Sequence, residues 1–95
     1  MKTVIIIKSS KIEKKYMAMF NINGKKRTVH FGQASADDYT ITKNEEQKKR
    51  YRTRHKKDLD TGDPTRAGYL SYYILWNKPT ITESIASYKK MFNFN

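Results

Sequence analysis

Basic side chains are concentrated in one short stretch of the sequence. Seven of the ten residues from position 48 to 57 are positively charged: Lys48, Lys49, Arg50, Arg52, Arg54, Lys56 and Lys57. Like charges at this density repel one another along a helix unless an anion neutralises them. A phosphate backbone does so, and the release of its counterions adds affinity. The run predicts a surface that contacts nucleic-acid phosphates, with His55 as a further contact.

A second group of cations surrounds a predicted β-hairpin: Lys25, Lys26 and Arg27, together with Lys14 and Lys15. We expect this group to support the phosphate contacts of the first. Two other interpretations of the charges stay open, namely binding to an acidic protein and a surface that is merely solvated. Nothing in the pattern indicates that base sequence is read, because phosphate contact is the default role of these cations.

Acid–base chemistry is the alternative use of the polar residues. His55 precedes Asp58, Asp60 and Asp63, from which a metal-dependent nuclease could be built. Those acids fall among turn-forming residues, where Asp usually turns or caps the chain, and His30 belongs to a predicted strand. Two histidines make no zinc site without further ligands, and no phosphate-binding glycine loop or serine-nucleophile motif occurs. We therefore expect no enzyme, no metal and no cofactor.

Composition sets the scale of the molecule. The chain has 95 residues, a net charge of +11, no cysteine and 13% aromatic residues. This length fits one small domain, residues 1–95, and so many aromatic residues are unusual in a disordered basic tail. The longest apolar run, from Val4 to Ile7, is too short for a membrane span or a secretion signal. We expect a soluble intracellular protein that is not secreted and has no membrane partner.

The N-terminal third predicts an antiparallel sheet. Three segments are rich in β-branched and aromatic residues and predict strands: 3–8, 14–21 and 25–31. Asn23-Gly24 between the second and third tolerates the positive φ angles of a type I′ hairpin turn. A two-residue turn places Phe20 opposite Arg27. We expect Gly32 to end the third strand.

Helices are expected in the rest of the chain. The basic segment 43–57 contains good helix formers, and Tyr51 and His55 recur with helical spacing on one face of it. A break is expected over 58–64, after which Asp63 would cap a helix that starts at Pro64.

The last two predicted helices supply the core. The second runs to about Trp76, and its tyrosines are interpreted as core residues rather than as platforms for bases. Thr80 and Glu83 match a capping box that starts the third. We therefore expect an α+β fold, in which an N-terminal three-stranded antiparallel sheet is followed by three helices and the last two pack on the sheet.

Several blocks of sequence carry a resemblance: Val29-His30-Phe31-Gly32, Asp38-Tyr39-Thr40, Arg50-Tyr51 with Arg54-His55-Lys56, Ile74-Leu75-Trp76-Asn77-Lys78-Pro79-Thr80, and Ile85 with Tyr88-Lys89 and Phe92. Over residues 14–93 the chain resembles a family of short basic proteins of nucleocytoplasmic large DNA viruses, the giant viruses of algae and amoebae. The resemblance implies a viral origin and a location in the virion or inside the infected host cell. It supplies no catalytic residue.

Together these features predict a non-enzymatic protein that binds nucleic acid, DNA rather than RNA, with little dependence on sequence. The alternative is a virion structural or assembly protein whose basic face binds acidic capsid or core proteins. A small metal-dependent nuclease is the third interpretation.

Overall fold

Three antiparallel strands form one layer of the molecule in the computed structural model, which describes residues 1–95. They are β1 (Lys2–Lys8), β2 (Lys14–Ile22) and β3 (Lys25–Gln33), in the order β1-β2-β3. At the turn from β2 to β3, Asn23 has φ 54° and Gly24 has φ 87°. Phe20 lies opposite Arg27, so the predicted hairpin and its register are confirmed.

Gly32 does not end the third strand, and that prediction was wrong. β3 continues through it to Gln33. Gly32 has φ +79°, and a Cβ atom at this position would lie 2.8 Å from Cδ1 of Leu75. The glycine is needed because a helix packs closely on the strand here and the backbone adopts a conformation that side chains disfavour.

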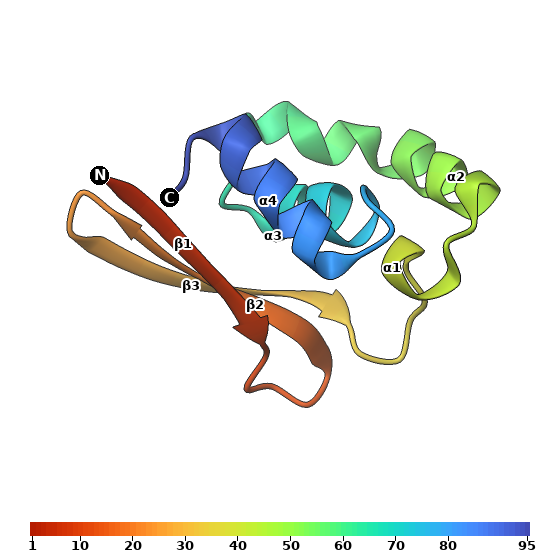
Figure 1. Cartoon of the computed structure of the whole chain (residues 1–95), viewed down its shortest axis with the longest axis horizontal. Helices are drawn as coiled ribbons and strands as arrows, with labels where there is room; N and C mark the ends of the chain where they lie inside the picture. Colours follow the sequence, from red (N-terminus) through yellow and green to blue (C-terminus); the bar gives the residue numbers. More distant parts are fainter.

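The helices follow the sheet and lie together over one of its faces (Figure 1). In chain order they are α1 (Tyr39–Thr42), α2 (Glu45–His55), the 3-10 helix η1 (Lys56–Thr61), α3 (Ala67–Leu70), the π-helical turn η2 (Ser71–Leu75) and α4 (Ile81–Phe92). The α+β fold is therefore confirmed, with α3, η2 and α4 as the helical segments expected to cover the sheet.

The connection between the basic helix and α3 differs from the prediction. The chain stays helical as η1 up to Thr61, and Gly62 ends it in the left-handed conformation. Asp63 does not cap a helix at Pro64, since its Oδ1 accepts hydrogen bonds from the backbone N–H and the hydroxyl of Thr65, at 3.0 and 2.6 Å. These bonds close a turn instead, so α3 begins only at Ala67.

The start of α4 is as predicted. The Thr80 hydroxyl accepts a hydrogen bond from the backbone N–H of Glu83 at 3.2 Å. It also donates to the Glu83 carboxylate at 2.9 Å, so the two residues hold each other in place. Tyr88, on the same helix, is fully buried.

The core lies between the inner face of the sheet and the helices. Its buried residues are Val4, Ala18, Phe20 and Phe31 from the strands, and Tyr39, Leu70, Ile74, Leu75, Trp76, Tyr88 and Phe94 from the rest of the chain. Removal of these side chains from water is the main force that holds the two layers together. The interpretation of the aromatic residues of the second helical segment as core is confirmed for Tyr69, Tyr72 and Trp76.

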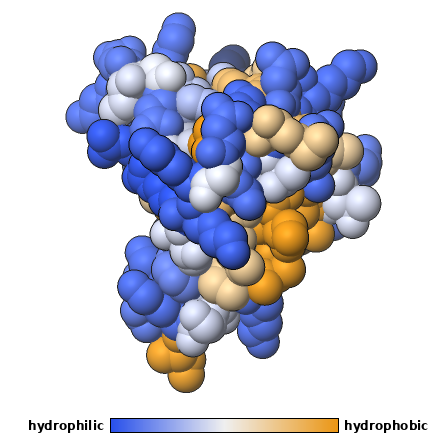
Figure 2. Space-filling model, turned by 90° about the vertical axis from the view of Figure 1, so that its left-hand side faces the viewer, coloured by the Kyte–Doolittle hydropathy of each residue, from blue (hydrophilic) through white to orange (hydrophobic).

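The other face of the sheet is not covered. Ile5, Ile7 and Met19 are exposed there. Figure 2 shows an apolar patch beside a surface that is otherwise mostly hydrophilic. None of the helices has both the length and the apolar character needed to cross a membrane.

Candidate nucleic-acid interface

The basic helix α2 is fixed at its start by a polar cap. The side-chain oxygen of Asn44 accepts a hydrogen bond from the backbone N–H of Gln47 at 3.0 Å. Glu45 and Glu46 lie in the first turn, and the last turn is basic. Both distributions match the helix dipole, which favours negative charge at the N-terminus and positive charge at the C-terminus. The order of charges along the sequence thus helps the helix to form.

Two of the predicted phosphate contacts face the protein interior. Arg52 Nε donates to the carbonyl oxygen of Trp76 at 2.8 Å, and Lys48 Nζ donates to that of Asn77, also at 2.8 Å. These carbonyls follow η2, where a helix end leaves acceptors without partners. The Arg52 guanidinium also lies 4.4 Å from the ring centre of Tyr72. Lys48 and Arg52 therefore attach α2 to the rest of the fold.

Five other cations of the run lie on the outer side of α2 and at its junction with η1. Lys49, Arg50, Arg54, Lys56 and Lys57 are exposed, and none of them forms an ion pair with a carboxylate. Arg54 makes only weak contacts, 3.4 Å from its Nε to Nε2 of His55 and 6.0 Å from its guanidinium carbon to the ring centre of Tyr51. This outer group is free to meet an anion from solution.

We expected the hairpin cations to form one cluster with Lys14 and Lys15, and this prediction was wrong. Lys25, Lys26 and Arg27 are exposed at the hairpin end, remote from α2 (Figure 1). Lys14 is at the opposite end of β2, which spans roughly 26 Å at the usual rise per residue. Lys15 forms an ion pair with the buried Asp38. The two ends of a nine-residue strand cannot contribute to one local site.

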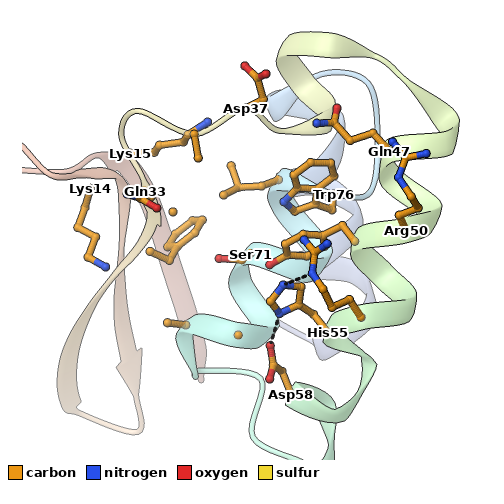
Figure 3. A pocket seen from close by; sticks show the side chains of 18 residues that line it. Lys14, Lys15, Gln33, Asp37, Gln47, Arg50, His55, Asp58, Ser71 and Trp76 are labelled. Carbon is orange, nitrogen blue, oxygen red and sulfur yellow. Dashed lines mark hydrogen bonds and ion pairs between the residues drawn. The ribbon is translucent and has the colours of Figure 1, made fainter.

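Lys14 lies instead on a groove that α2 also lines (Figure 3). The groove has a volume of about 740 Å³. One wall comes from the ends of β2 and β3 and the other from α2, with residues of η2 and Trp76 between them. Arg50 and Arg54 line the wall formed by α2. The fold therefore brings together cations that are 36 or more positions apart in the sequence.

Three stacked rings stand along this groove. The Trp76 and Tyr51 ring centres are 4.4 Å apart, and those of Tyr51 and His55 are 4.2 Å apart. Tyr51 and His55 therefore share one face of α2, as predicted, and this face lines the groove. Burial, and the charge of Asp58, raise the pKa of the Tyr51 hydroxyl, while a hydrogen bond with Ser71 opposes this. The stack gives the groove a rigid aromatic side.

The histidines have partners within the protein. His55 Nδ1 lies 3.1 Å from a carboxylate oxygen of Asp58, and His30 Nδ1 lies 2.7 Å from the hydroxyl of Ser9. No three His, Asp or Glu side chains gather closely enough to hold a metal ion. Asp60 and Asp63 do not join His55, so the acids that follow it in the sequence do not form one cluster with it.

Sequence reasoning missed three residues of the groove. Lys14 was assigned to the wrong end of the sheet, Trp76 was interpreted as core rather than as a residue that stacks on bases, and Gln33 was not considered at all. A signal for the first was available, because the length of β2 already separates Lys14 from the turn. The contact of Gly32 with Leu75, which sets the position of the strand wall, has no signal in the local sequence.

The fold and the groove define a small α+β protein in which a basic helix faces the end of an antiparallel sheet across a groove. The chain belongs to a family described as a family of unknown function (DUF5754), whose model matches residues 4–55. The match extends from β1 to the end of α2, and so includes both walls of the groove. No curated protein and no solved structure matches the chain.

Proposed function

We propose that the protein binds nucleic acid, preferably DNA, through contacts of the outer cations of α2 and η1 with phosphates. The observation that carries this proposal is the set of five exposed cations without a carboxylate partner: Lys49, Arg50, Arg54, Lys56 and Lys57. Unneutralised positive charge of this density is a source of repulsion in the free protein. Phosphates relieve it, and the released counterions favour binding.

The hairpin cations are a second contact of the same kind. Lys25, Lys26 and Arg27 lie at the hairpin end of the sheet, remote from α2 (Figure 1). A polyanion must extend from α2 to the hairpin to reach both, so affinity increases with the length of the nucleic acid. Because phosphates recur regularly in any sequence, binding depends little on base composition.

The test measures binding of a fluorescently labelled DNA duplex by anisotropy over a range of salt concentrations. Five phosphate contacts on duplex DNA predict a slope of about −4.5 for log affinity against log salt concentration. The triple variant Lys49→Gln, Lys56→Gln, Lys57→Gln should weaken binding and reduce the steepness of the slope by about 2.7.

The matched control neutralises three exposed lysines elsewhere, with Lys8→Gln, Lys11→Gln and Lys90→Gln. It removes the same charge, so a site on α2 predicts a much smaller effect. An affinity for DNA that does not change with salt concentration contradicts the proposal. So do equal losses in the two triple variants, or an affinity for poly-glutamate as high as that for DNA, which would indicate an acidic protein partner.

A further inference from the structure

Both walls of the groove between the strands and α2 carry positive charge. Lys14 on the strand wall makes no side-chain hydrogen bond or ion pair, and neither does Arg50 on the helix wall. Lys15 is neutralised by Asp38, and Asp58 faces His55. Of the groove's side chains, three cations (Lys14, Arg50 and Arg54) are therefore without a carboxylate partner, against a single unpaired carboxylate, that of Asp37.

The groove also contains a hydrogen-bond donor that has no partner within the protein. The Trp76 side chain is only 7% exposed, yet its indole nitrogen forms no hydrogen bond with the protein. Since no fully buried side-chain nitrogen or oxygen atom lacks a partner, this nitrogen must be reachable from solvent. In Figure 3 it lies on the side of the ring that faces the strands, across the groove. A buried indole N–H usually has an acceptor, so this one is available to a ligand.

Two amides stand beside these groups. The Gln33 side chain on the strand wall makes no hydrogen bond, and the Gln47 side chain on the helix wall uses only its oxygen, which accepts from Thr42 at 2.8 Å. Side-chain amides can pair with the donors and acceptors of a base edge. The rings of Trp76, Tyr51 and His55 are stacked on one another, so the groove presents polar edges more than open ring faces.

We infer that this groove binds an unpaired nucleotide of a single-stranded nucleic acid, with its phosphates on the cations of the two walls and a base edge at Trp76. In a duplex the bases are turned inward and paired, and only phosphates meet the outer face of α2. A single strand can place a phosphate and a base edge in the groove together, which is how unpaired bases are recognised elsewhere. The volume of about 740 Å³ is in the range of small-molecule sites. The inference rests on the proposed function and adds a preference for single strands.

Trp76 is the only tryptophan, so its fluorescence reports directly on the groove. The experiment titrates the protein with a single-stranded oligothymidine and with a duplex of the same length, at one low salt concentration. Thymine offers oxygen acceptors to an indole N–H. We expect the single strand to change the Trp76 emission and the duplex to leave it nearly unchanged, although both bind by anisotropy.

The variant Lys14→Gln should weaken binding of the single strand by roughly tenfold, the usual size for the loss of a charged contact. Lys90→Gln is the matched control, since Lys90 is also an exposed lysine without an ion pair, and it lies on α4, outside the groove. It should change the affinity by less than about twofold, as a remote surface charge does.

The outcomes separate this inference from the proposed function. Binding of both nucleic acids without a change in Trp76 emission overturns the groove site and leaves the phosphate surface of α2 standing. The same emission change with the duplex, or equal effects of Lys14→Gln and Lys90→Gln, also overturns it. If neither nucleic acid binds at low salt, both the inference and the proposed function are wrong.

Discussion

The two sides of α2 carry the same residue types and differ in what surrounds them. On the inner side Lys48 and Arg52 meet backbone carbonyls and aromatic rings. On the outer side Lys49 and Arg50 meet only solvent. The comparison shows that a run of positive charge in a sequence need not form a single surface. Part of this one holds the helix in place, and only the remainder is free to bind.

The inner contacts are favourable because three effects act together. The carbonyl groups of Trp76 and Asn77 follow a helix end, which is electronegative. The tyrosine rings offer a face with negative charge density, on which a cation is attracted. The long aliphatic parts of Lys48 and Arg52 cover apolar surface while their charged ends reach polar partners. Among the outer cations only Arg54 approaches an aromatic ring, at 6.0 Å from the ring centre of Tyr51, and none meets a backbone carbonyl, so they contribute little to stability.

The largest effect is expected for Arg52→Ala. The change removes a charged hydrogen bond to the Trp76 carbonyl and a contact with the Tyr72 ring, and leaves the carbonyl without its partner. We expect the free energy of unfolding to fall by about 3 kcal/mol. Urea denaturation followed by the fluorescence of Trp76 measures it. Arg50→Ala is the control and should cost less than about 0.5 kcal/mol; equal losses would abolish the distinction between the two sides.

A pair of neighbouring lysines sharpens the comparison. Lys48→Ala removes a hydrogen bond to the Asn77 carbonyl and a contact with the Tyr39 ring, and should lower the free energy of unfolding by about 1.5 kcal/mol. Lys49→Ala should leave stability unchanged within about 0.5 kcal/mol. DNA affinity should show the reverse order, with the larger loss in Lys49→Ala. The comparison fails if the same variant shows both the larger loss of unfolding free energy and the larger loss of DNA affinity.

The planar shape of the arginine guanidinium should contribute to stability on the inner side of α2 only. Arg52→Lys keeps the charge but loses the planar group that stacks on Tyr72 and donates from Nε, so we expect a loss of about 1 kcal/mol in unfolding free energy. Arg50→Lys keeps the charge at an exposed position, and stability and duplex affinity should both change by less than about 0.3 kcal/mol. Thermal unfolding and anisotropy on the same two variants measure these effects. A larger loss of stability or of duplex affinity in Arg50→Lys would indicate that Arg50 makes a specific contact on the outer side of α2.

The sequence was sufficient for features that arise between near neighbours. The Asn23-Gly24 turn fixes the register of β2 and β3, and Thr80 with Glu83 fixes the start of α4, because each acts within a few residues. The inward position of Tyr51 also follows from helical spacing.

Features that depend on distant partners were missed. Nothing near Gly32 in the sequence indicates that Leu75 approaches it, and nothing near Lys48 or Arg52 indicates the carbonyls that they meet. Asp63 was misassigned because two structures compete for its side chain, a helix cap and a tight turn with Thr65, and the turn forms. The groove is likewise invisible in the sequence, since its walls meet only in the folded chain.

The smallest effect concerns the hairpin cations, which differ from the outer side of α2 in having an acid nearby. Hydrogen bonds from the hydroxyl and the backbone N–H of Thr65 hold the pKa of Asp63 below its usual value, and the charges of Arg27 and Arg66 add to this. A carboxyl whose pKa is lower in the folded state stabilises the fold above its unfolded pKa, and that contribution disappears as the pH falls through the folded value.

Asp63→Asn should therefore be less stable than the wild type near pH 6, and the difference should shrink as the pH falls below about 4, the usual pKa of an Asp carboxyl. Because this carboxylate is partly exposed, solvent screening keeps the effect smaller than those of the inner cations. Asp60→Asn is the control, since its side chain is exposed and makes no hydrogen bond or ion pair. Urea unfolding across this pH range measures both variants. A difference between Asp63→Asn and the wild type that does not shrink as the pH falls would show that the turn depends on side-chain shape and that Arg27 is as free as the outer cations of α2.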